Sequence, residues 1–129
     1  MREIKFRGKD TTGIWRYGGI YGTVQPHIIH SIAGYETRAF TQVDPETVGQ
    51  FTGELDTNNR EIYEGDIIEI IYGVDPEYGE HIERHEVVFE HGAFKIGNDV
   101  MSVVCGYNPM RVVGNKFDNP ELLKDGEKK

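Results

Sequence analysis

Residues 59–71 read NREIYEGDIIEII, and this stretch has the strongest strand pattern in the chain. A tight Glu64-Gly65-Asp66 turn comes first, because glycine adopts positive φ readily and aspartate closes a turn through its side chain. The turn is followed by isoleucines at positions 67, 68, 70 and 71. Such a run is typical of a well-buried strand. The sequence therefore predicts a structural turn at Glu64, Gly65 and Asp66 that opens a long strand.

Short strand patterns continue on both sides of this stretch. The best hairpin is HEVVFEHGAFKIG (85–97), in which Val87 and Phe89 would stand opposite Phe94 and Ile96 across a His-Gly turn. Further strands are expected in residues 2–8, 13–21, 23–34 and 100–115, with the third interrupted at Pro26 because proline lacks a backbone donor. The polar segment 73–84 is expected to be a loop.

Helical signals are few and short. Asp44 followed by Pro45 predicts one capped turn, and Asn119 followed by Pro120 predicts a closing turn. The pattern as a whole predicts a mostly β fold: a small SH3-like or curled β-barrel, or a twisted antiparallel sheet, with one or two short helical turns. The length of 129 residues predicts a single domain over residues 1–124, with a frayed tail at 125–129.

The composition and charge argue against several classes of protein. The net charge is −8, and residues 54–86 hold eleven Asp and Glu against two Arg, whereas the first 18 residues carry a net +3. This overall balance argues against a general nucleic-acid binder, which is usually strongly basic. There is one cysteine, no apolar leader at the start and no run long enough to span a membrane. We therefore expect a soluble cytoplasmic protein.

Four blocks of the chain resemble a known family. They are REIKFRGKD (2–10), VGQFTGELDTNNREIYEGDII (48–68), VVFEHGAFKIG (87–97) and VVGNKFDNPELL (112–123). Together they resemble the YopX family, small proteins found mostly in bacteriophages and prophages. The chain departs from the family pattern at residues 6–10 and in the acidic segment 72–86. The resemblance implies a mostly β fold and a phage or prophage origin, is compatible with homo-oligomerisation, and implies no enzymatic activity.

The candidate chemical groups do not assemble into a site. Glu64 and Asp66 could form a carboxylate pair, but no third ligand or base stands at a recognisable spacing from them. Cys105 lies in an apolar context without a neighbouring base. The sequence therefore predicts no catalytic residue, no metal and no cofactor.

Four of the five histidines form two pairs, His27 with His30 and His81 with His85. Zinc needs three or four convergent ligands, and HIERH differs from the helical zinc-protease motif in the position of its glutamate. Surface histidines are the preferred interpretation. A metal-dependent hydrolase built on the histidines and the Glu64–Asp66 turn is the weakest of the hypotheses.

The N-terminal strand offers a different kind of site. Small β-barrels bind single-stranded nucleic acid by stacking bases on aromatic rings beside a basic groove. The residues that could do this are Lys5, Arg7, Lys9, Trp15 and Arg16. The first hypothesis is nevertheless a non-enzymatic phage or prophage accessory protein that acts through protein–protein binding or self-association. Nucleic-acid binding by the N-terminal strand is the alternative.

Overall fold

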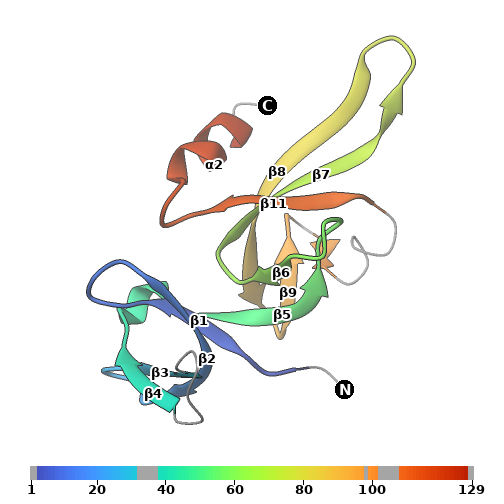
Figure 1. Ribbon diagram of the computed structural model, residues 1–129. Coiled ribbons are helices and arrows are strands. Elements are labelled where there is room, and N and C mark those ends of the chain that lie inside the picture. Colours follow the sequence, from blue (N-terminus) through green and yellow to red (C-terminus); the bar gives the residue numbers. More distant parts are fainter. Residues whose placement is uncertain (1–2, 32–37, 98, 102–107, 128–129) are drawn as a thin grey trace. The chain divides into compact units, whose positions relative to one another are not determined.

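The computed structural model describes residues 3–31, 38–97, 99–101 and 108–127 (Figure 1). The predicted mostly β fold is confirmed: the strands lie in two antiparallel sheets, and neither sheet is closed into a barrel within the described residues. The chain divides into two compact units, Met1–Phe51 and Thr52–Lys129. The single domain expected over residues 1–124 stays a prediction, because compactness alone does not decide whether the units fold together.

The first unit is an antiparallel meander. Its strands follow one another in the sheet in the order β4-β3-β2-β1: β1 (Phe6–Lys9), β2 (Trp15–Tyr21), β3 (His27–Ser31) and β4 (Arg38–Gln42). The other edge of β1 pairs with the start of β5 (Gly49–Leu55). Pro26 immediately precedes β3, as expected for a residue without a backbone donor. The predicted turn at Asp44 is the 3₁₀ helix η1 (Pro45–Thr47), capped by the Asp44 carboxylate, which accepts from the Glu46 amide.

One face of this meander is the core of the first unit. Ile28 and Val43 are fully buried there. Gly8 allows β1 to approach Val43 closely, because a Cβ at this position would lie 2.8 Å from a methyl carbon of Val43. A larger residue at position 8 would therefore push the strands apart.

The second unit holds the longer strands and the helix. They are β6 (Glu61–Tyr63), β7 (Asp66–Asp75), β8 (Gly79–Glu90), β9 (Ala93–Ile96), β10 (Asp99–Val100), β11 (Met110–Asn115) and α2 (Pro120–Glu127). The order in the second sheet is β10-β9-β8-β7-β11. The expected hairpin is confirmed, with Val87 opposite Ile96 and Phe89 opposite Phe94. Its turn residues His91 and Gly92 both have positive φ, at 55° and 80°.

The isoleucine run at the start of β7 supplies much of the core. Ile67, Ile68 and Ile70 have no exposed surface, which confirms the prediction of a well-buried strand. The register places Ile68 opposite Val112 and Ile70 opposite Met110 of β11. These four side chains belong to one cluster with Ile62, Val87, Phe94, Ile96 and Met101.

Two expectations are wrong. Residues 73–84 are not a loop: β7 continues to Asp75 and β8 begins at Gly79, so the pair runs on as a two-stranded arm beyond β11 (Figure 1). The closing helical turn is also longer than expected, because α2 extends from Pro120 to Glu127. The frayed tail expected at residues 125–129 stays a prediction. Within the described residues, no helix is both long and apolar enough to cross a membrane.

Candidate functional site

The Glu64–Gly65 turn is fastened to the strands around it. Gly65 has a φ of 92°, its amide donates to the Val87 carbonyl at 2.9 Å, and its carbonyl accepts from the Lys116 amide at 2.9 Å. Asp66 is 2% exposed, and its Oδ2 accepts a hydrogen bond from the Tyr63 amide at 2.7 Å. The buried carboxylate therefore closes the backbone turn, which is a structural role.

The histidine pairs lie apart in the sequence and make separate contacts. His30 Nε2 lies 2.6 Å from the Thr41 hydroxyl. On β8, His81 and His85 each place Nε2 on a different oxygen of Glu83, at 2.7 and 2.8 Å. The hydrogen bond from His81, followed by that from His85, lowers the pKa of Glu83.

No metal site emerges from the part of the chain that the structure describes. There, no group of three or more His, Cys, Asp or Glu side chains could hold a metal ion. Cys105 lies outside the described residues. The described residues therefore provide no ligand set for a metal-dependent hydrolase, and the absence of such an activity stays a prediction.

The N-terminal basic residues contact aromatic rings. Arg7 is 5% exposed, and its guanidinium carbon lies 4.6 Å from the centroid of the Trp15 ring. Lys9, opposite Trp15 in the β1–β2 register, has its Nζ 5.5 Å from the same centroid. Lys5 Nζ lies 5.4 Å from the Phe51 ring centroid. The structure brings Arg7, Lys9 and Trp15 together, but as a cation–π cluster in which the arginine is withdrawn from solvent.

Arg16 has a different partner. Its Nε donates to Asp10 Oδ2 at 3.0 Å. Asp10 also orders the β1–β2 turn: its Oδ1 accepts from the Thr12 hydroxyl at 2.6 Å and from the Ile14 amide at 3.0 Å. These donors, the Thr12 hydroxyl first, hold the pKa of Asp10 well below its usual range. Arg16 therefore supports a turn in this structure.

An exposed aromatic pair on the same unit was not anticipated as a site. Tyr21 on β2 is 65% exposed and Phe40 on β4 is 60% exposed, and their rings meet edge to face at 6.1 Å between centroids. The strand register places Ile29 of β3 directly opposite Phe40. We call Tyr21, Ile29 and Phe40 the aromatic edge, because β4 is the last strand of its sheet. The sequence signal was weak, since Tyr21 and Phe40 meet only through the pairing of three strands.

Comparison with known proteins places the chain in a family. The model of the YopX protein family matches residues 5–124, so the chain belongs to the YopX family. A solved structure, described as the crystal structure of protein EF1440 from Enterococcus faecalis, is similar with a TM-score of 0.59 and 24% sequence identity. The similarity covers 95% of this chain and 99% of that one, and it shows a shared fold. No curated protein matches the chain.

Proposed function

We propose that this member of the YopX family is a non-enzymatic accessory protein of a phage or prophage that acts in the bacterial cytoplasm by protein–protein binding at the aromatic edge. Its origin and location rest on the family resemblance alone. The observation that carries the binding role is the exposed Tyr21–Phe40 pair on an edge strand.

Two physical arguments support binding at this surface. Aromatic side chains are enriched at protein interfaces because a rigid ring buries much apolar area at little entropic cost. An edge strand also offers unpaired backbone donors and acceptors, to which an extended chain can add as a further strand. Phe40 combines both features, because it lies on the edge strand and presents its ring to solvent.

Self-association is the simplest form of this binding. Two copies of β4 can pair antiparallel about a two-fold axis, and such an interface is self-complementary. The strand contains no proline and no lysine, which are residues that commonly block edge pairing. The partner that we propose first is therefore a second copy of this chain.

Nucleic-acid binding by the N-terminal strand is less well supported. The Arg7 guanidinium is buried against Trp15, and Arg16 is paired with Asp10. A phosphate at Arg7 would require exposure of a buried side chain, and a phosphate at Arg16 would compete with the Asp10 carboxylate. The proposal of protein binding needs no such rearrangement.

Sedimentation velocity tests self-association. We expect the wild-type protein to form a discrete oligomer, and we expect Phe40→Lys to shift it to monomer by placing a charge in the proposed interface. Tyr78→Lys is the matched control, because Tyr78 is 83% exposed in the second unit and outside the aromatic edge. An oligomer that is equally stable in Phe40→Lys would contradict the proposed interface. A separate activity assay tests the non-enzymatic assignment, which saturable turnover of a phosphoester, peptide or glycoside by the purified protein would overturn.

A further inference from the structure

The second unit contains a row of charged side chains across three neighbouring strands, β8, β7 and the edge strand β11. Glu69 of β7 is directly opposite Arg84 of β8 on one side and Arg111 of β11 on the other. The Glu69 carboxylate accepts from Arg84 Nε at 3.3 Å, and from Arg111 Nε at 3.0 Å and Nη2 at 2.7 Å. Burial alone would raise the pKa of Glu69, but the hydrogen bonds from Arg111 and Arg84 outweigh it and lower that pKa. Glu69 is thus ionised at neutral pH, and the row of two guanidiniums and one carboxylate carries a surplus of one positive charge.

This surplus is unusual in its surroundings. Residues 52–129 contain seventeen Asp and Glu against eight Lys and Arg, a difference of −9. A local positive charge in an acidic unit marks a place where a small anion would be favoured over the adjacent surface. The charge is also accessible, because the Arg111 side chain is 60% exposed whereas that of Glu69 is 13% exposed.

Arg111 has a second edge available for binding. Glu69 occupies the edge formed by Nε and Nη2, and both donate to the same oxygen, Oε1. A guanidinium presents five N–H groups, so the edge formed by Nη1 and Nη2 can receive another planar acceptor. Within the described residues, no hydrogen bond from Nη1 of Arg111 is present to compete with such a ligand.

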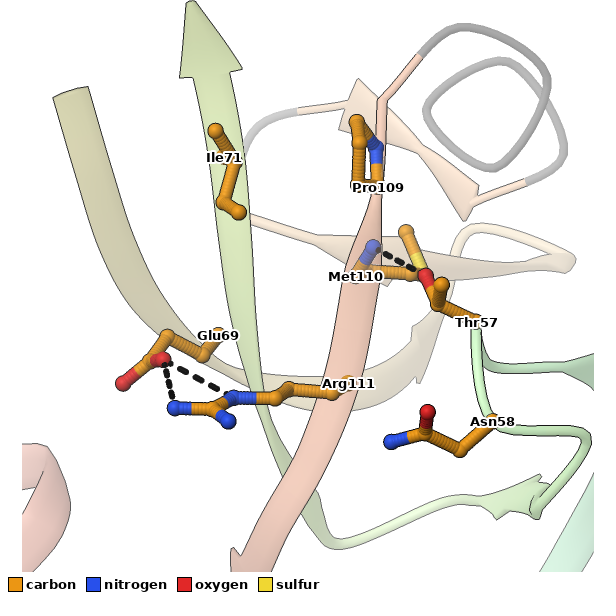
Figure 2. Close-up of a pocket in the computed structure, with 7 residues that line it drawn as sticks. All are labelled: Thr57, Asn58, Glu69, Ile71, Pro109, Met110 and Arg111. Carbon is orange, nitrogen blue, oxygen red and sulfur yellow. Dashed lines mark hydrogen bonds and ion pairs between the residues drawn. The ribbon is translucent and has the colours of Figure 1, made fainter. Parts of the chain in front are cut away.

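A hollow of about 180 Å³ lies beside Arg111 (Figure 2). Asn58 lines it from the other side of β11, whereas the Arg111 guanidinium extends toward Glu69 (Figure 2). The Thr57 hydroxyl accepts from the Met110 amide at 3.0 Å, which leaves its own proton to donate. Ile71 and Pro109 provide an apolar wall. The hollow therefore combines one cation and two neutral donors with a small apolar surface.

We infer that this hollow binds the carboxylate end of a small molecule or of a peptide, with Arg111 as the charged anchor. The volume is below the roughly 300–1,000 Å³ of sites for drug-sized ligands, so it suits an end group with a short apolar stem. A monoanion balances the single surplus charge, whereas a phosphate dianion would leave net negative charge in a unit that is already acidic. Arg111 holds the carboxylate, and Ile71 and Pro109 contact the stem. Thr57 and Asn58 donate to polar groups elsewhere on the ligand.

Titration followed by ¹⁵N NMR tests this site in the full chain. The probes are sodium propionate, the tripeptide Gly-Ala-Val as free acid, the same peptide amidated, and sodium phosphate, each against sodium chloride at equal ionic strength. We expect saturable shifts of the Arg111 Nε–H and Asn58 amide signals with propionate and the free-acid peptide, and none with the amide. Tighter binding of the peptide would identify a chain terminus as the source of the carboxylate, and tighter binding of propionate would identify a free acid.

Variants separate the site from general electrostatics. Arg111→Gln should weaken binding at least tenfold, and Arg111→Lys should give an intermediate loss, because lysine keeps the charge without the planar fork. Lys116→Gln makes the same change of charge outside the hollow, where Lys116 pairs with Glu86, and should leave binding within twofold. Unsaturable shifts, shifts that persist in Arg111→Gln with a native-like spectrum, or phosphate binding as tight as that of propionate would overturn the inference.

Discussion

The Asp66 carboxylate provides a quantitative test of the turn that opens β7. Asp66→Ala removes the acceptor of the Tyr63 amide, which lies 2.7 Å away in a position where both residues are 2% exposed. Water does not readily replace a partner lost at such a site. Asp66→Asn keeps one oxygen in reach of the same amide, removes the charge and replaces the other carboxylate oxygen by an NH2 group. Glu64→Ala alters the neighbouring turn residue, whose side chain is half-buried, and is the matched control.

The expected magnitudes follow from the bond that is lost. A hydrogen bond to a charged group contributes about 1.5–3 kcal/mol, so Asp66→Ala should lower the free energy of unfolding by about 2–3 kcal/mol. Asp66→Asn should cost about 1 kcal/mol, since a neutral acceptor remains. Glu64→Ala should cost less than about 1 kcal/mol. Against a total stability of about 5–15 kcal/mol, the alanine variant should still fold.

Urea unfolding followed by far-UV circular dichroism measures these differences. Fluorescence of Trp15, the one tryptophan, is recorded in parallel because it reports on the first unit. If the two units unfold separately, only the circular dichroism transition of the second unit should move. A cost below about 1 kcal/mol for Asp66→Ala, or an equal cost for Asp66→Asn and Asp66→Ala, would refute the reasoning that the buried acceptor holds the turn.

Three further predictions concern other parts of the chain. Gly8→Ala should lower the free energy of unfolding by about 1–3 kcal/mol, because its Cβ would collide with Val43. The double variant with Val43→Ala should lose less stability than the two single variants together, and strict additivity in urea unfolding would contradict the contact. The lowered pKa of Glu83 implies a stabilisation that is present above the ordinary glutamate pKa of 4.5 and is lost as the pH falls through the lower folded value. The difference in unfolding free energy between wild type and Glu83→Gln should therefore shrink on acidification. A difference that grows below pH 4.5 would contradict this sign. We expect no binding of a single-stranded oligonucleotide in a fluorescence anisotropy assay at low salt. Binding that weakens steeply with salt and disappears in Lys5→Glu/Lys9→Glu would instead favour nucleic-acid binding by the N-terminal strand.

Local signals predicted those parts of the fold that depend on neighbours in sequence. The His91-Gly92 turn was predictable because two adjacent residues with positive φ match the twist of a hairpin. The capped turn at Asp44 was predictable because cap and proline are adjacent. The buried start of β7 followed from its isoleucines, which need a core on both faces.

Features that depend on distant pairing were not predictable. The arm at residues 73–84 extends past β11, so its side chains do not pack on the core and need not alternate between apolar and polar residues. Its two strands are held together by backbone pairing, which leaves no hydrophobic pattern in the sequence. The contact between Glu69 and Arg111 joins residues 42 positions apart, through a register that no local motif encodes. Burial of Arg7 against Trp15 likewise follows from strand pairing, whereas the sequence alone suggested an accessible basic groove.

The end of the β7–β8 arm is a suitable place for protein engineering. Its turn closes on itself, because Asp75 Oδ1 accepts from the Glu77 amide at 2.7 Å and from the Tyr78 amide at 2.9 Å. The side chains there are exposed and contribute nothing to the buried cluster of the second unit. Exposed loop tips of this kind tolerate insertions and new chain termini. An epitope, a fluorophore or a proximity-labelling enzyme inserted between Glu77 and Tyr78 would therefore leave the buried cluster of the second unit unaltered, and would carry a reporter on that unit into a living host.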